Sequence, residues 1–267
     1  MKLAWATDIH FDHLDDDGKI SALEALSTSG ADDIVICGDI GTANNLIWSL
    51  SKIDEHIPFG ASVYFVLGNH DFYNSSVKKV RHLVSEFCRS HVRMEYLHFS
   101  HHPVRIGKNT CIIGCDGWGD SLNGDFEDTR VRMSDFAYIE DLCWLTHEEL
   151  RKKLIAFGEE SANKIRRLLM MAVRRFPNII MATHIPPFVE SSWYEGKQSS
   201  VDFLPFFTCA TVGRVLEEVM GKFPDNKLTV LCGHSHGGGE FIKGNIRVLT
   251  GKAEYGKVTK QEILCTG

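Results

Sequence analysis

Five apolar runs of strand length each end at residue types that bind metal ions, and this pattern constrains the fold more than any other feature of the chain. The runs cover residues 3–7, 34–37, 63–67, 179–183 and 228–232. The polar groups that follow them are Asp8-Ile9-His10, Gly38-Asp39, Gly68-Asn69-His70-Asp71, His184 and Gly233-His234-Ser235-His236. Nearly continuous apolar runs are typical of strands that are buried on both faces. The pattern therefore predicts sheet strands that lie inside the protein.

Helix-like patterns separate the first three runs, over about 18–29, 43–54 and 75–89. The order strand–helix–strand indicates parallel strands joined by right-handed crossovers. The carboxyl ends of such strands point the same way, and ligands bind in the crevice beyond them. We therefore expect all five polar groups to meet at one edge of one sheet.

The rest of the chain continues an α/β pattern. A further strand is predicted over 110–114, one or two helices over about 145–176, and a β-hairpin with arms 239–242 and 246–249. The sequence carries no repeat, low-complexity tract or linker. We therefore predict a single domain over residues 1–267.

The residues that end the strands form a mixed set of metal ligands. Three of them offer oxygen and four offer imidazole nitrogen: Asp8, Asp39 and Asn69, then His10, His184, His234 and His236. Mixed nitrogen and oxygen sets suit Mn, Fe, Zn or Ni in open catalytic sites, whereas structural zinc sites usually use thiolates. Seven ligands are too many for one ion. The count therefore favours two divalent metal ions that share a carboxylate.

These motifs, in this order, resemble the signature of the calcineurin-like metallophosphoesterase family. The family pattern reads D-x-H, G-D, G-N-H-D/E, H and G-H-x-H, and the match runs from residue 8 to residue 236. Each motif alone is weak, but all five in order, each after a strand, are specific. The resemblance implies an α/β/β/α sandwich of two mixed β-sheets flanked by helices.

The resemblance also implies a role for each motif residue. The first metal would be bound by Asp8, His10 and His236, and the second by Asn69, His184 and His234, with Asp39 bridging the two. His70 would orient the phosphate and protonate the leaving oxygen as general acid. Asp71 would fix the ring of His70. A hydroxide that bridges the metals would attack phosphorus, so the expected activity is hydrolysis of a small phosphomonoester or phosphodiester, including a cyclic nucleotide or nucleotide derivative.

Two loops are candidates for the substrate wall. The loop over 114–140 contains Trp118, Arg130 and Arg132, and an arginine there could clamp a phosphate or carboxylate. The alternative is a surface loop with solvated arginines. The loop over 188–210 carries aromatic residues that either stack a base or sugar or cover a hydrophobic edge.

The remaining histidines lack this context. They follow no strand end, and we expect them to be surface or hydrogen-bonded residues: His13, His56, His82, His91, His98, His101, His102 and His147.

Charge and hydropathy limit the partners. The formal net charge is −6, whereas a nucleic-acid binder needs a basic face, so a nucleic-acid partner is not expected. No stretch has the ~18 apolar residues of a membrane helix, and the N-terminus lacks a signal-peptide core. The eight cysteines form no CxxC pair, which favours reduced structural cysteines and a cytoplasmic location. The sequence does not determine the oligomeric state.

The sequence is also compatible with two other functions on the same fold. A non-catalytic, protein-binding member of the family would have lost metal ligands or the catalytic histidine. A nuclease of the family would carry a basic cleft, which this acidic chain does not indicate.

Overall fold

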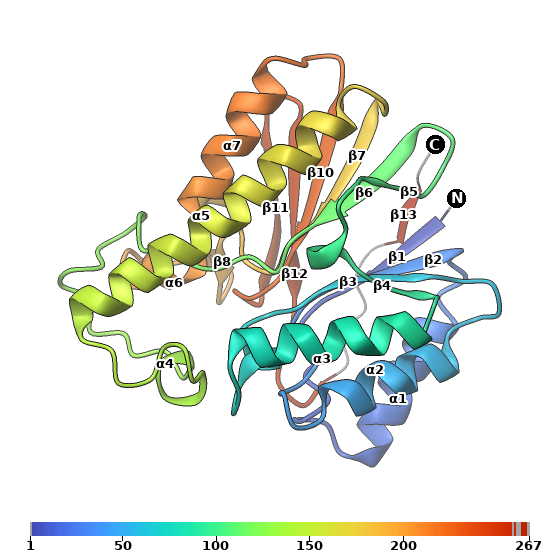
Figure 1. The fold of residues 1–267 in the computed structure, drawn as a ribbon, viewed down its shortest axis with the longest axis horizontal. Helices are drawn as coiled ribbons and strands as arrows, with labels where there is room; N and C mark the ends of the chain where they lie inside the picture. The colour runs from blue at the N-terminus through green and yellow to red at the C-terminus, as the bar shows by residue number, and fades with distance from the viewer. Residues whose placement is uncertain (1, 258, 260–262, 266–267) are drawn as a thin grey trace.

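Two β-sheets pack face to face, and helices cover the outer face of each sheet (Figure 1). The computed structural model describes residues 2–257, 259 and 263–265. The predicted α/β/β/α sandwich of two mixed sheets is confirmed.

The first sheet has the strand order β13-β1-β2-β3-β4. Strands β1 to β4 pair in parallel, and β13 pairs antiparallel with β1. Its elements are β1 (Lys2–Ala6), α1 (Asp16–Ser27), β2 (Asp33–Cys37), α2 (Leu46–His56), β3 (Val63–Val66), α3 (Val77–Ser90), β4 (Met94–Tyr96) and β13 (Ile263–Cys265), with 3-10 turns η1 (His70–Phe72) and η2 (Leu97–Phe99).

The second sheet has the order β11-β12-β10-β7-β6-β5, with parallel pairing from β12 to β6 and an antiparallel strand at each edge. Its strands are β5 (Val104–Arg105), β6 (Thr110–Gly114), β7 (Asn178–Ala182), β10 (Lys227–Cys232), β11 (Gly237–Lys243) and β12 (Ile246–Lys252). Between them lie α4 (Asp135–Tyr138), α5 (His147–Ala172), the 3-10 turn η3 (Val189–Ser191), the small hairpin β8 (Trp193–Tyr194) and β9 (Lys197–Gln198), α6 (Leu204–Phe207) and α7 (Ala210–Gly221).

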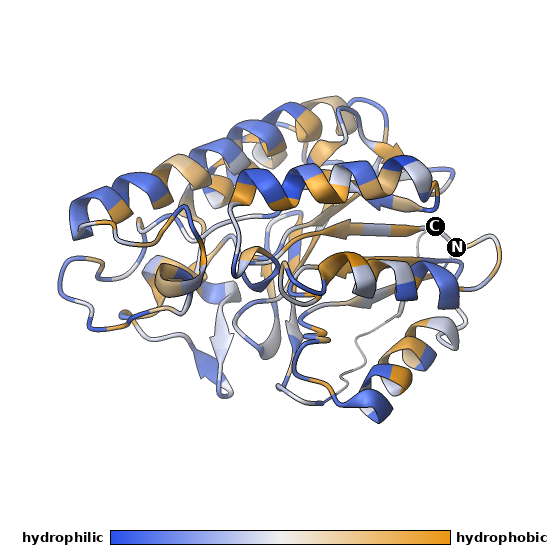
Figure 2. Ribbon diagram, turned by 60° about the horizontal axis from the view of Figure 1, so that its bottom comes forward, coloured by the Kyte–Doolittle hydropathy of each residue, from blue (hydrophilic) through white to orange (hydrophobic). Residues whose placement is uncertain are grey.

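Side-chain alternation along the strands produces three apolar layers. In β2, Ile34 and Ile36 face helices α1 to α3, while Val35 and Cys37 face the second sheet. Helices α5 and α7 cover the outer face of the second sheet. Figure 2 shows largely hydrophobic strands between helices that carry hydrophilic residues interleaved with hydrophobic ones.

The predicted elements are present, with shifted ends. The region over 145–176 forms one long helix, α5, which begins with a capping box between Thr146 and Glu149. The predicted C-terminal hairpin is formed by β11 and β12. Among the described residues, no helix is long and apolar enough to cross a membrane.

Candidate metal centre

The five polar groups meet at one end of the sandwich, but they come from two sheets. Asp8, Asp39 and Asn69 follow strands of the first sheet, whereas His184 and His234 follow β7 and β10 of the second. The prediction of one edge of one sheet is therefore wrong. Parallel strands of both sheets point their carboxyl ends the same way, so the groups still converge.

One cluster gathers Asp8, His10, Asp39 and His236, each offering one ligand atom within 4.8 Å of the others. The Nε2 atom of His236 lies 3.2 Å from Asp8 Oδ1 and 3.4 Å from His10 Nε2. His10 Nε2 lies 3.7 Å from Asp39 Oδ2. These spacings match those of ligand atoms around a single ion.

A second cluster gathers Asp39, His184 and His234 under the same 4.8 Å limit. His184 Nε2 lies 3.3 Å from Asp39 Oδ2. The side-chain oxygen of Asn69 lies 3.0 Å from His184 Nε2 and 2.9 Å from His234 Nδ1. Asp39 belongs to both clusters, so one buried carboxylate lies between two groups of possible ligands.

The carboxylates of Asp8 and Asp39 are both held in the charged form. Burial alone would raise the pKa of Asp8, but the hydrogen bond from His236 and the charge of His184 bring it down to about 2. Burial opposes the charge of Asp39 too, yet the imidazoles of His184 and His70 hold its pKa well below the usual range. The centre therefore keeps two negative charges in a buried position, which is a strong attraction for cations.

The imidazoles divide into two kinds. Burial lowers the pKa of His10 to about 4 and that of His234 to about 3, so both are neutral and carry a free lone pair. Burial works against a proton on His184, but Asp39 raises its pKa to about 10. Metal ligation requires deprotonated imidazole, so a cation beside Asp39 would displace that proton.

The donor set fits divalent metal ions. The buried Nε2 atom of His234 and the buried Nδ1 atom of His10 have no hydrogen-bond partner among the described residues. The nitrogens of these two residues that face the other ligands are His234 Nδ1 and His10 Nε2, so these are the atoms that would bind an ion. Oxygen and imidazole donors are what Mn, Fe, Zn and Ni accept.

The strand ends position these side chains through close backbone contacts. The amide of Asp8 donates to Gly38, and that of His234 donates to the Asp8 carboxylate. Gly38 has a positive φ of 85°, as expected for a sharp turn. Gly68 does not have a positive φ. Its small size is needed instead, because a Cβ there would collide with the Asp39 carboxylate.

His70 lies at the edge of the centre. Its ring stacks on Tyr73 with centroids 4.3 Å apart and meets the His10 ring edge-on at 4.7 Å. Its amide donates to Asp39 Oδ1.

Asp71 is fully buried, and its carboxylate is bonded to the backbone. Its carboxylate accepts from the backbone amides of Ile40, Gly41 and Gly68. Among the described contacts, none joins this carboxylate to the His70 ring. The prediction that Asp71 fixes the ring is therefore corrected: it holds together the loops that carry Asp39 and Asn69. Burial raises the pKa of Asp71 well above the usual range.

A cleft of about 470 Å³ opens over the centre. One wall comes from both predicted substrate loops, and a second comes from the segment after β12. The lining residues outside the two ligand clusters are Asn69, His70, Tyr73, Val131, Arg132, Met133, Ser134, Tyr194, Phe203, Phe207 and Tyr255.

Only one of the three predicted substrate contacts lines this cleft. Arg132 does, and its guanidinium also donates to the carbonyl of Val131. Arg130 is exposed and lies outside the residues that line the cleft. Trp118 is 3% exposed, and its ring packs between Phe72 and Phe157. Such a large apolar ring is stabilised by burial in the core. Trp118 is therefore withdrawn as a substrate contact.

The structure also brings residues to the site that the sequence did not indicate. The hydroxyl of Tyr255 lies 3.4 Å from His70 Nε2, and its ring is 4.6 Å from that of His10. His13 was expected to be an ordinary surface residue, but its ring lies 5.7 Å from that of His10. Tyr73 lies two residues after the motif Gly68-Asn69-His70-Asp71, and this proximity is a local sequence signal that it lies near the site. No comparable signal in the sequence marks Tyr255.

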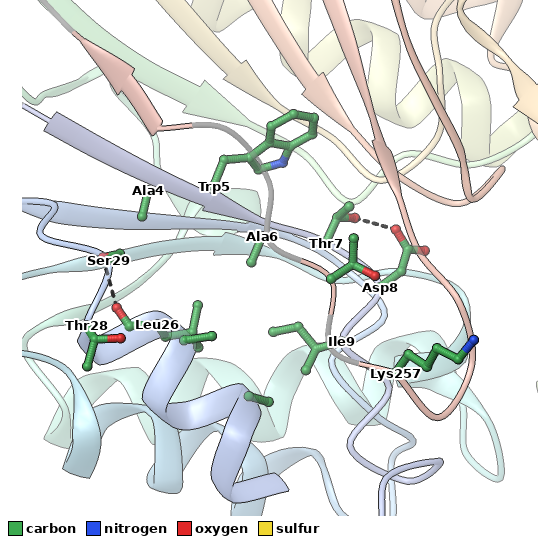
Figure 3. A pocket seen from close by; sticks show the side chains of 13 residues that line it. Ala4, Trp5, Ala6, Thr7, Asp8, Ile9, Leu26, Thr28, Ser29 and Lys257 are labelled. Carbon is green, nitrogen blue, oxygen red and sulfur yellow. Dashed lines mark hydrogen bonds between the residues drawn. The ribbon is translucent and has the colours of Figure 1, made fainter. Parts of the chain in front are cut away.

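A second cavity of about 270 Å³ lies on the other side of Asp8, between β1 and α1 (Figure 3). Figure 3 shows the hydroxyl of Thr7 bonded to the Asp8 carboxylate, at 2.6 Å. This hydrogen bond restrains the Asp8 carboxylate. Among the described residues that line it there is no histidine, and Asp8 is the one predicted ligand, so the cavity is separate from the metal centre.

Comparison with known proteins agrees with this geometry. The sequence model of the family described as calcineurin-like phosphoesterase matches residues 1–238. A comparison with curated proteins found no match.

Solved structures share the fold at low sequence identity. Phosphopantetheinyl hydrolase from Mycobacterium tuberculosis has a TM-score of 0.70 at 15% identity, with 96% of this chain and 90% of that chain covered. GAP50, described as the anchor in the inner membrane complex of Plasmodium, has a TM-score of 0.54 at 13% identity, covering 99% of this chain and 77% of that one. At such identities the similarity establishes the fold alone.

Proposed function

Because the chain belongs to the calcineurin-like phosphoesterase family, we propose that it hydrolyses a small phosphorylated substrate with two divalent metal ions bound at the candidate centre. The observation that carries this proposal is that Asp39 lies in both clusters of possible ligands. A carboxylate that lies in both sets of ligands could bind two ions at once and keep them close together, as the two-metal sites of phosphatases do.

Each ion has its own set of residues in this proposal. Asp8, His10 and His236 would hold one, and Asn69, His184 and His234 the other, with Asp39 between them. When bound, the ions supply positive charge for phosphoryl oxygens and lower the pKa of water toward neutrality. The protein's part is to keep these donors buried and fixed around that charge.

His70 is the proposed general acid. Its ring lines the cleft beside His10 and rests on Tyr73, which limits its rotation. A histidine in this position would orient the phosphate and give a proton to the departing oxygen. Such a proton transfer contributes about 10²- to 10⁴-fold to the rate.

The cleft supports a small substrate with an anionic and an aromatic part. Its volume suits a small molecule rather than a polymer. Arg132 is the one lysine or arginine among the described residues that line it, so a basic nucleic-acid track is not supported. The rings of Tyr194 and Phe203 are stacked 5.8 Å apart and could continue into a stack with a base.

We therefore propose phosphomonoesters and phosphodiesters of nucleotide type, cyclic nucleotides included, as the substrates to test first. The name of the structural neighbour from M. tuberculosis, a hydrolase, is in line with this proposal. The non-catalytic alternative is disfavoured because the centre retains the complete set of proposed ligands and His70. The seven cysteines whose side chains are described are free, which fits the proposed cytoplasmic location.

The test uses protein stripped with a chelator and reloaded with Mn or Zn. We expect hydrolysis of p-nitrophenyl phosphate or of bis(p-nitrophenyl) phosphate only after reloading. His70→Ala should lower kcat at least 100-fold on alkyl esters and less on p-nitrophenyl esters, because p-nitrophenolate leaves without needing a proton.

The matched control is His82→Ala, which removes an exposed imidazole from α3 and should leave the rate unchanged. The proposal fails if the reloaded protein hydrolyses neither p-nitrophenyl phosphate nor bis(p-nitrophenyl) phosphate. The role of His70 fails if His70→Ala slows alkyl and p-nitrophenyl esters equally.

A further inference from the structure

The side chain of Asn69 has two chemically different ends, and only one of them can bind a metal ion. The carbonyl oxygen Oδ1 is a donor of lone pairs, whereas the nitrogen Nδ2 carries two hydrogens. In the structure Oδ1 faces His184 and His234, at 3.0 and 2.9 Å. A rotation of the amide by half a turn would place the nitrogen there and remove the ligand.

A carboxylate from a distant part of the chain meets the opposite end of this amide. Asp135, the first residue of α4, is 8% exposed. Its Oδ1 accepts a hydrogen bond from Asn69 Nδ2 at 2.8 Å and another from the Tyr73 hydroxyl at 2.7 Å. An ionised carboxylate only accepts hydrogen bonds, so it pairs with the NH₂ end of an amide and repels the carbonyl end.

The bond from Tyr73 holds this carboxylate in place. The Tyr73 hydroxyl reaches Asp135 from the ring that stacks on His70, and both hydrogen bonds are buried. A small cavity lined by Trp118, Phe136 and Phe206 lies beside Asp135, so its surroundings are largely apolar. Few alternative partners are therefore available to the amide of Asn69 or to the carboxylate.

We infer that Asp135 is a positioning residue that fixes the Asn69 amide with its oxygen toward His184 and His234. This inference rests on the proposed function, which makes Asn69 a metal ligand. Asp135 acts through Asn69 and does not touch the ions itself. Residues that orient a ligand in this way typically matter 10- to 100-fold for metal affinity.

The experiment measures how many manganese ions the full chain binds and how tightly, by titration calorimetry on chelator-stripped protein. Asn69→Ala is the reference and should weaken one of two binding events. Asp135→Ala should weaken the same event 10- to 100-fold and leave the other unchanged. Asp135→Asn should stay within about threefold of the wild type, because its amide oxygen can still accept both hydrogen bonds.

Two more variants separate orientation from packing. Tyr73→Phe removes the second donor to Asp135 but keeps the Asn69–Asp135 bond, so it should weaken the same binding event less than Asp135→Ala does. Asp135→Leu keeps the branching and the number of side-chain heavy atoms but removes the acceptor, and it should match Asp135→Ala. The leucine variant replaces the alanine variant if circular dichroism shows that the latter is unfolded.

The outcomes distinguish this inference from the proposed function. If Asp135→Ala and Asp135→Leu bind manganese like the wild type while Asn69→Ala loses one event, the inference is overturned and the proposed function stands. Equal losses in Tyr73→Phe and Asp135→Ala would also overturn it. If Asn69→Ala itself binds both ions normally, the metal centre and the inference both fail.

Discussion

At the scale of single residues, five of the seven proposed metal ligands adopt backbone conformations that are rare for residues with a Cβ atom. The φ angles of Asp8, His10, Asp39, His234 and His236 lie between 49° and 66°. Each such residue costs about 1 to 3 kcal/mol unless its surroundings enforce the conformation. The hydrogen bonds of the strand ends supply that enforcement, for example from the amide of His10 to the carbonyl of Asp39.

Gly68→Ala tests how closely the strand ends must approach. The added Cβ would meet the backbone nitrogen and the carboxylate of Asp39, neither of which can move freely. We expect the free energy of unfolding to fall by about 1 to 3 kcal/mol and manganese affinity to fall with it. Urea unfolding and metal titration measure the two effects.

The matched control for this prediction is Gly221→Ala at the end of α7, where a Cβ would meet nothing within 4 Å. It should leave both quantities unchanged. If Gly68→Ala behaves like this control, the close approach at Asp39 is not required.

At the scale of elements, a network of charges joins α3, α5, the loop after β6 and the turn η2 after β4. Arg81 of α3 donates to the buried Asp116 and to Glu160 of α5, at 2.9 and 2.8 Å. Asp116 accepts from the amide of Leu67, and its carbonyl accepts from the amide of His184. The network therefore also supports the strand ends before Asn69 and at His184, one in each sheet.

Glu160→Gln tests this network through pH. The His98 imidazole, 3.7 Å away, and the charge and hydrogen bond of Arg81 lower the pKa of Glu160 from its usual 4.5 to about 2, against the effect of burial. A lowered pKa in the folded state stabilises the protein above about pH 4.5, and this stabilisation disappears as the pH falls toward 2. Because Glu160 is 47% exposed, solvent screens the pair, and we expect about 0.5 to 1 kcal/mol.

Urea unfolding at pH 7 and at pH 3.5 measures the difference between wild type and variant, which should shrink at the lower pH. Glu159→Gln, at an exposed position next to it on α5, is the control and should show no such trend. A difference that is constant with pH would contradict the ionic role of Glu160.

At the scale of the whole molecule, the metal centre lies where the two sheets meet, so bound ions should stabilise the entire fold. An ion at 100 times its dissociation constant adds about 2.7 kcal/mol per site. We expect manganese to raise the melting temperature by roughly 5 to 10 °C and a chelator to reverse the increase. Differential scanning calorimetry measures it.

Asp39→Ala should abolish most of this increase, because Asp39 lies in both clusters. The relevant quantity is the change on adding metal within each variant, which removes any effect of the substitution on the metal-free protein. Asp12→Asn, in the nearby loop, is the control. An unchanged increase in Asp39→Ala would exclude a shared carboxylate.

The sequence predicted local features well, because they depend on neighbouring residues. Apolar runs marked the strands, and the polar groups after them marked the residues that the structure brings together, such as Asp39 and His184. It did not predict which strands share a sheet. The runs at 34–37 and 179–183 are apolar on both faces, so nothing in either run distinguishes the face that packs on a helix from the face that packs on the other sheet.

The sequence by itself therefore determined the fold class and the set of proposed ligands, since strand periodicity and donor chemistry are properties of short segments. Only the tertiary structure decided that Trp118 lies in the core, that Tyr255 reaches His70 and that Asp135 bonds Asn69. Asn69 and Asp135 are 66 positions apart in the sequence, and His70 and Tyr255 are 185 apart. Packing across the whole molecule therefore sets these contacts.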